Sequence, residues 1–157
     1  SMQHAYDRSN LPKIEGAKVA ILQSKWHSEQ TNLMVKKCAD LLTAAGAASD
    51  VHVLPGSLEL PLAADRLAKT KRYDAVVCFG VIMKGETFHF DLILQMVELG
   101  FVRAMHDNDM PILIEILPVT TMAQVEARSG DNEFNKGYEA GLAAIDIIKW
   151  RRENPAK

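Results

Sequence analysis

A group of residues between positions 85 and 89 has the composition of a phosphate site next to a proton-transfer group. Gly85, Glu86 and Thr87 precede a predicted helix, and His89 lies in its first turn. The free N–H groups and positive dipole at a helix start attract phosphate, and a glycine allows close approach. An imidazole that titrates near neutral pH is the usual general acid or base. The segment therefore predicts phosphate binding beside acid–base chemistry, although an ordinary capped turn and a structural histidine fit the same residues.

Aromatic and basic residues elsewhere in the chain suit the same kind of ligand. Trp26 follows a predicted strand and offers a flat surface on which a heteroaromatic ring can stack. Arg128 and Lys136 flank a polar stretch and carry the charge that neutralises a phosphate, the arginine through two parallel hydrogen bonds. A half-buried core tryptophan and two solvated surface charges are the structural alternatives.

Short apolar segments that alternate with helical patterns would position these residues. We expect strands at 18–23, 51–54, 75–82 and 112–117, and helices at 29–45, 57–69, 88–105, 121–128 and 135–152. Ser28 and Ser57 are candidate helix caps, and Thr121 and Gln124 have the spacing of a capping box. Residues 1–16 predict an irregular N-terminal arm, and we interpret Ser1 as a tag remnant.

This order of elements predicts the fold and the location of the site. Strands that alternate with helices form a parallel sheet covered on both faces, here a three-layer α/β/α sandwich with a four-stranded parallel sheet, flavodoxin-like, in a single domain over 1–157. Open parallel sheets bind ligands at the carboxyl ends of their strands. Trp26, segment 57–59 and segment 83–89 each follow a strand, so we expect them on one rim.

Composition excludes several classes of function. The net charge of −2 among 157 residues gives no positive field for nucleic acid or an anionic membrane. The longest apolar run, at 75–83, is far shorter than the roughly 20 residues that cross a bilayer. Cys38 and Cys78 lie in apolar patterns, which favours reduced core thiols in a cytoplasmic protein. The chain has no nucleotide P-loop, no Rossmann glycine fingerprint and no spacing typical of a metal site.

Three blocks taken together resemble lumazine synthase, an enzyme family of riboflavin biosynthesis. They are PGSLELP at 55–61, GVIMKGETFHFD at 80–91, and Arg128 followed by NKG at 135–137. The resemblance spans residues 18–150. It implies condensation of 5-amino-6-(D-ribitylamino)uracil with 3,4-dihydroxy-2-butanone 4-phosphate to 6,7-dimethyl-8-ribityllumazine, with release of phosphate and water, and it implies no metal and no organic cofactor.

The resemblance also implies a role for each site residue. For the pyrimidine, the residues are Trp26 for stacking, Ser57, Leu58 and Glu59 for the ribityl chain, and the backbone of Val81, Ile82 and Met83 for the uracil edge. For the ketone, they are Gly85, Glu86, Thr87 and Arg128 for the phosphate and His89 for proton transfer. Lys136 matches a basic residue near the substrates, and Ile114 a position that packs against a neighbour's ligand.

Family members place their sites between subunits of a pentameric ring, so the resemblance implies a homo-oligomer, a pentamer or a decamer of two pentamers. Lys84, Ile114 and Glu115 depart from common family residues, which are arginine, an aromatic residue and a small residue. The pair Trp26-His27 occurs in a subgroup that includes type II members. A non-catalytic lumazine- or flavin-binding protein and a related riboflavin synthase of the same fold remain alternatives.

Overall fold

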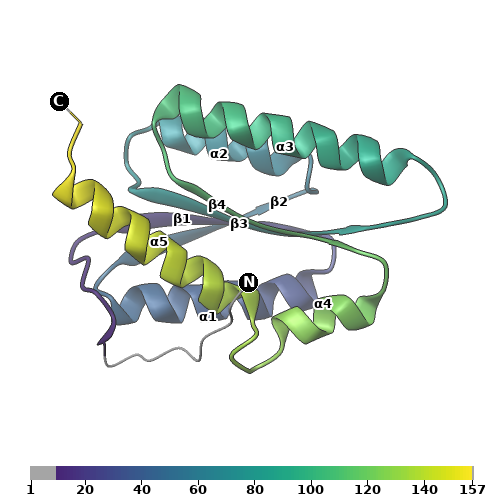
Figure 1. Ribbon diagram of the computed structural model, residues 1–157, viewed down its shortest axis with the longest axis horizontal. Coiled ribbons are helices and arrows are strands. Elements are labelled where there is room, and N and C mark those ends of the chain that lie inside the picture. The colour runs from purple at the N-terminus through teal and green to yellow at the C-terminus, as the bar shows by residue number, and fades with distance from the viewer. Residues whose placement is uncertain (1–9, 157) are drawn as a thin grey trace.

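The computed structural model describes residues 10–156, which form a parallel sheet with helices on both faces (Figure 1). The elements, in chain order, are β1 (Lys18–Ser24), α1 (Ser28–Ala44), β2 (Ala48–Leu54), α2 (Glu59–Lys69), β3 (Ala75–Met83), α3 (His89–Asn108), β4 (Ile112–Val119), α4 (Met122–Ser129) and α5 (Lys136–Glu153). The predicted order of strands and helices is confirmed.

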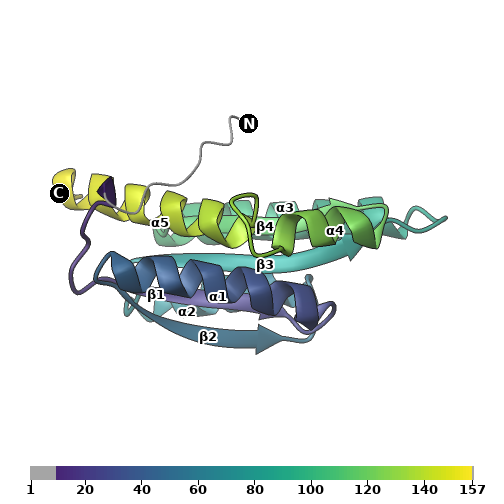
Figure 2. The ribbon, with the colours of Figure 1, turned by 90° about the horizontal axis from the view of Figure 1, so that it is seen from below.

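The sheet has the order β2-β1-β3-β4, and every pair of neighbouring strands is parallel. Helices α2 and α3 cover one face, and α1, α4 and α5 cover the other (Figures 1 and 2). The predicted three-layer flavodoxin-like sandwich is therefore confirmed. Within the described residues, β2 and β4 are the edge strands of the sheet.

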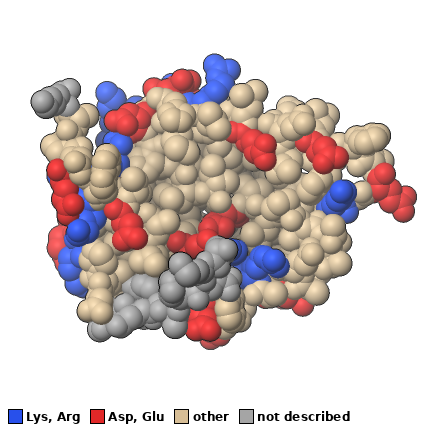
Figure 3. Space-filling model, viewed as in Figure 1, with Lys and Arg blue, Asp and Glu red and all other residues tan. Residues whose placement is uncertain are grey.

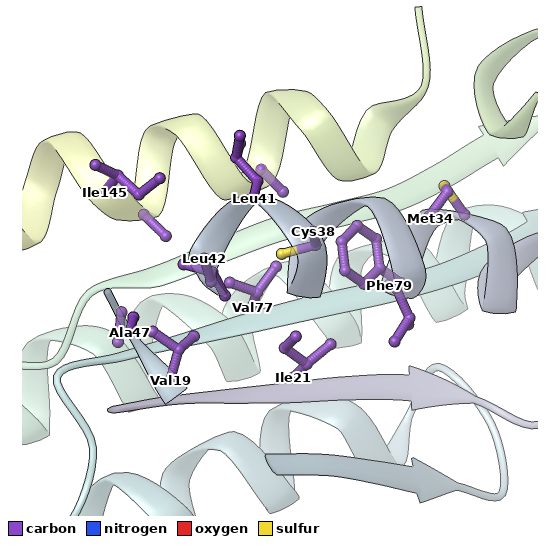
Figure 4. Packing of buried hydrophobic residues seen from close by; sticks show 14 of the residues in the cluster. Val19, Ile21, Met34, Cys38, Leu41, Leu42, Ala47, Val77, Phe79 and Ile145 are labelled. Carbon is purple, nitrogen blue, oxygen red and sulfur yellow. The ribbon is translucent and has the colours of Figure 1, made fainter. Parts of the chain in front are cut away.

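Two apolar layers fix the helices on the sheet. Val19 and Ile21 point to the α1 and α5 side, whereas Ala20 and Leu22 point to the α2 and α3 side, and all four are fully buried. A strand that is buried on both faces reads as a continuous apolar run, which is why the sequence identified it. Figure 4 shows part of the first layer, where side chains of α1 and α5 meet those of the central strands.

Both cysteines lie inside these layers, as the sequence predicted. Cys38 of α1 and Cys78 of β3 are free and fully buried. Burial raises the pKa of both thiols, so neither supplies a thiolate near neutral pH.

The predicted helix ends are partly wrong. Neither Ser28 nor Ser57 is a cap, because α1 begins after His27, whose φ is 58°, and α2 begins after Leu58. The capping box of Thr121 and Gln124 is present, and the side chain of Asn135 caps α5. Strand β2 begins three residues before the predicted start, because Ala48, Ser49 and Asp50 pair along β1 although none of them is buried.

The predicted N-terminal arm falls partly outside the described residues. Residues 1–9, with Ser1, are not described, and residues 10–17 form no strand or α-helix. Ile14 is fully buried, and its N–H donates to the carbonyl of Ala45. Among the described residues, no helix is long and apolar enough to cross a membrane.

Candidate active site

The carboxyl ends of β1 and β3 lie side by side at the centre of the sheet. The chain leaves β1 for α1 on one face, and it leaves β3 for α3 on the opposite face (Figure 1). Such a divergence opens a crevice at the strand ends, which is where ligands bind in open parallel sheets.

A pocket of about 340 Å³ occupies this position, within the usual size range for small ligands. Its wall contains many of the residues predicted from the sequence, namely Trp26, Ser57, Leu58, Glu59, Val81, Ile82, Met83 and His89. The structure thus brings these side chains and backbone segments together around one cavity. Their individual roles remain predictions.

Trp26 forms an exposed aromatic wall of the pocket, with 71% of its surface accessible. A β-carbon placed on Gly56 would lie 3.6 Å from the indole ring and 3.7 Å from a carboxylate oxygen of Glu59. The ring and the carboxylate therefore converge over Gly56. An exposed indole beside a carboxylate offers one surface for stacking and one group that accepts hydrogen bonds from hydroxyls.

Gly80 of β3 sets the position of Ser57. A β-carbon on Gly80 would lie 3.0 Å from the Ser57 hydroxyl and 3.0 Å from Ile116. Real side chains rarely approach so closely, so the absence of a side chain at residue 80 allows the β2–α2 loop to pack against β3. This contact holds Ser57 next to β3, near the carboxyl end of that strand.

The predicted phosphate loop adjoins the pocket but does not line it. Gly85, Glu86 and Thr87 are exposed in the loop between β3 and α3, and the Thr87 hydroxyl accepts a hydrogen bond from the N–H of His89 at 3.3 Å. A β-carbon on Gly85 would meet nothing within 4 Å. Phe88 provides no side-chain cap, so apart from the N–H of His89, which bonds to Thr87, the amides in the first turn of α3 have no partner within the helix.

Three predicted residues lie away from the pocket of their own chain. Arg128 is exposed on α4, where its Nη1 donates to the carbonyl of Gln124 at 2.8 Å. Lys136 begins α5 and forms an ion pair of 2.5 Å with Glu139. Ile114 lies on the edge strand β4 with 41% of its surface exposed. The pocket is lined in part by the starts of α2 and α3, whereas α4 and α5 cover the opposite face of the sheet (Figure 1).

One carboxyl group near these residues is unusual. Glu115 of β4 is partly buried, and desolvation together with the charge of Glu139 raises its pKa to about 7, against a smaller opposing effect of Lys136. Sequence reasoning had marked Glu115 only as a departure from the family.

Sequence reasoning missed four residues of the pocket wall, which are His27, Gly56, Phe90 and Ile93. Their inclusion depends on loop geometry and on which side of α3 faces the sheet. Among the described residues, no group of three or more histidine, cysteine or carboxylate side chains could hold a metal ion.

Comparisons with known proteins identify the family. The model of the family 6,7-dimethyl-8-ribityllumazine synthase matches residues 16–152. A protein of that name from Gemmatimonas aurantiaca is 34% identical over 143 residues, covering 89% of this chain and 87% of the relative. 6,7-dimethyl-8-ribityllumazine synthase 1 of Caulobacter vibrioides is 39% identical, covering 86% of this chain and 90% of the relative. The Coxiella burnetii (strain CbuG_Q212) synthase is 36% identical, covering 87% and 92%. The match to the family model and these relatives establish that the chain belongs to the 6,7-dimethyl-8-ribityllumazine synthase family.

Proposed function

We propose that the protein is a transferase that condenses 5-amino-6-(D-ribitylamino)uracil with 3,4-dihydroxy-2-butanone 4-phosphate to give 6,7-dimethyl-8-ribityllumazine in riboflavin biosynthesis. The observation that carries this proposal is the convergence of Trp26, segment 57–59, segment 81–83 and His89 on one pocket at the strand ends. Membership of the family supports the same reaction.

The pocket wall suits the pyrimidine substrate. The Trp26 indole stacks on the heteroaromatic ring, and the Glu59 carboxylate accepts hydrogen bonds from the ribityl hydroxyls. The carboxyl end of β3, at residues 81–83, offers backbone N–H and C=O groups to the uracil edge. These contacts hold the reacting amine in a fixed position, which matters because orienting two reactants can supply about 7–11 kcal/mol at the extreme.

The start of α3 suits the phosphorylated ketone. The loop at 85–87 and the helix amides bind the phosphate, and they stabilise it as it leaves. The amine forms an imine with the ketone and one water is lost. Phosphate then departs, a tautomerisation follows, and the ring closes when the ribityl-bearing nitrogen condenses with the remaining carbonyl and a second water is lost. Each of these steps moves protons, and His89 is the pocket residue suited to carry them.

We further propose that a second copy of the chain completes each site. Both edge strands expose apolar side chains, Val51 and Val53 on β2 and Ile114 on β4. The outer side of α3 exposes Leu92, Met96 and Leu99 as well. Figure 3 shows the face with β4 and α3 in front, and charged side chains are sparse over much of it. Two different apolar surfaces on opposite edges of one subunit favour head-to-tail contacts between subunits. Such contacts can close into a ring.

In such a ring the β4 side of one subunit meets the pocket of the next. This arrangement brings Arg128, Lys136 and Ile114 to the pocket of the neighbouring subunit, although they lie away from the pocket of their own chain. We propose a homopentamer, alone or paired as a decamer. The two buried free thiols favour a reducing compartment, and we place the enzyme in the cytoplasm.

The decisive test is to incubate the purified protein with both substrates and to follow lumazine fluorescence and phosphate release. The proposal predicts both products in parallel, well above the uncatalysed rate. Tight lumazine or riboflavin binding without turnover would instead identify a binding protein. Riboflavin formed from lumazine alone would identify a riboflavin synthase.

A further inference from the structure

The carboxyl end of β1 carries two buried polar residues, whereas the middle of the strand is apolar. Gln23 is only 3% exposed and Ser24 is fully buried, and we call this pair the polar end of β1. Gln23 lies on the same side of β1 as Ile21, and its neighbour on β3 is Phe79, so it occupies a place in the apolar layer under α1. A buried amide is unfavourable unless it is hydrogen-bonded, and an apolar residue here would avoid that cost.

The Gln23 amide fastens the first turns of α1 to the end of β1. Its Nε2 donates to the Thr31 hydroxyl at 3.1 Å and to the side-chain oxygen of Asn32 at 2.7 Å. Thr31 is fully buried as well, and its hydroxyl donates to the carbonyl of Ser28 at 3.4 Å. Because α1 has no side-chain cap, the hydrogen bonds from Gln23 help to fix where the helix begins.

The loop that contains Trp26 spans only the three residues between these two anchored segments. The Ser24 hydroxyl donates to the carbonyl of Trp26 at 3.3 Å. The carbonyl of His27 accepts hydrogen bonds from two amides of α1, at 3.0 and 3.1 Å. The backbone on both sides of Trp26 is therefore held, on one side by Ser24 and on the other by the helix that Gln23 fastens.

The indole of Trp26 depends on this backbone for its position. With 71% of its surface exposed, the ring has too little packing against the core to fix it. Its place over Gly56 therefore follows from the course of the loop. A stacking surface that is already in place binds more tightly than one that must be ordered when the ligand arrives.

We propose that Gln23 and Ser24 are positioning residues for Trp26, and that their hydrogen bonds hold the indole where the pyrimidine stacks. The inference rests on the proposed function, since it takes Trp26 as the stacking surface. It adds that the affinity for the pyrimidine, and not for the phosphorylated ketone, depends on buried hydrogen bonds made by residues that do not line the pocket.

The first test compares the steady-state kinetics of the wild type, Gln23→Leu and the control Cys38→Ala. Leucine is close to glutamine in size and suits the apolar layer, so the fold is kept while the hydrogen bonds to α1 are lost. Cys38 lies in the same layer on α1, so the control loosens packing without touching these bonds. In Gln23→Leu the KM for the pyrimidine should rise, by up to roughly tenfold, while the KM for the ketone stays level. A pyrimidine KM equal to that of the control would overturn the inference.

Two substitutions at Thr31 examine the same hydrogen bond from its acceptor. Valine keeps the shape of threonine without the hydroxyl, whereas serine keeps the hydroxyl and loses a methyl group. We expect Thr31→Val to raise the KM for the pyrimidine and Thr31→Ser to leave it near the wild-type value. Equal effects, or the reverse order, would point to packing and contradict the inference.

A double-mutant cycle shows whether Gln23 acts through Trp26. In Trp26→Ala the ring is gone, so the addition of Gln23→Leu should not raise the KM for the pyrimidine further. Additive effects of the two substitutions would show that Gln23 acts by another route.

The decay of fluorescence anisotropy, recorded without any substrate, gives a readout that needs no turnover. In a Trp150→Phe background the emission reports Trp26 alone, because the chain has two tryptophans. Gln23→Leu and Ser24→Ala should each add a nanosecond motion of the indole that Cys38→Ala lacks, and identical decays in all variants would contradict the inference. A wild-type enzyme that forms no lumazine would contradict the proposed function instead, and the anisotropy would still decide whether the polar end of β1 positions Trp26.

Discussion

Replacing Glu115 by glutamine tests the physical state of this carboxyl directly, through the free energy of unfolding. Its pKa is raised from 4.5 to about 7 in the folded chain, chiefly by desolvation. The fold therefore prefers the protonated form, and stability is lost as pH rises from the pKa of the unfolded state to that of the folded state. Above about pH 7 the loss is complete, and below about pH 4.5 it is absent.

The size of the effect follows from the same values. A difference between 4.5 and about 7 corresponds to about 3 kcal/mol at full strength. Partial contact with water screens the group, so we expect about 2 kcal/mol. Glutamine has nearly the same shape and never ionises. The stability of Glu115→Gln relative to the wild type should therefore increase by about 2 kcal/mol between pH 5 and pH 8.

Urea unfolding at a fixed protomer concentration measures this difference, because subunit assembly also contributes to stability. The other titratable groups are the same in both proteins and cancel in the comparison. Glu98 is an exposed carboxylate on α3, so the control variant Glu98→Gln should show no such trend. A stability difference between Glu115→Gln and the wild type that does not change with pH would refute the reasoning.

Three further substitutions test the site and the fold. His89→Ala should reduce kcat by about 10²–10⁴ with little change in either KM, because its proposed role is proton transfer, and unchanged turnover would remove it from the mechanism. Arg128→Ala should raise the KM for the phosphorylated ketone far more than that for the pyrimidine, whereas equal increases would argue against a phosphate contact. Gly137→Ala should destabilise the protein by several kcal/mol in thermal unfolding, because a β-carbon there would collide with the carbonyl of Met34. If this variant melts at the same temperature as the wild type, α1 and α5 can move apart to make room for the β-carbon.

The sequence predicted the layers and the rim because both depend on simple periodic patterns. The apolar runs that contain Ile21 and Val77 had to be buried strands, and their order along the chain placed Trp26 and His89 at the same end of the sheet. Parallel topology alone brings together residues that are far apart in sequence.

Local geometry was harder to predict. The left-handed backbone of His27 ends the β1–α1 loop and replaces the cap expected at Ser28, and no residue pattern signals a positive φ at a histidine. Phe90 and Ile93 join the pocket because of the side of α3 that faces the sheet. The burial of Glu115 depends on how α5 packs over β4, which composition does not reveal.

Assembly from two subunits is the central claim about the site, and mixed assemblies test it most directly. His89→Ala and Arg128→Ala are co-expressed and assayed at a ketone concentration far below the KM of Arg128→Ala, where each variant alone is nearly inactive. If each site takes His89 from one subunit and Arg128 from the next, about a quarter of the sites in a random mixture contain both, and about that fraction of wild-type activity returns. Mixed assemblies that form, as judged by mass, but show no activity beyond that of the separate variants would contradict a site shared between subunits.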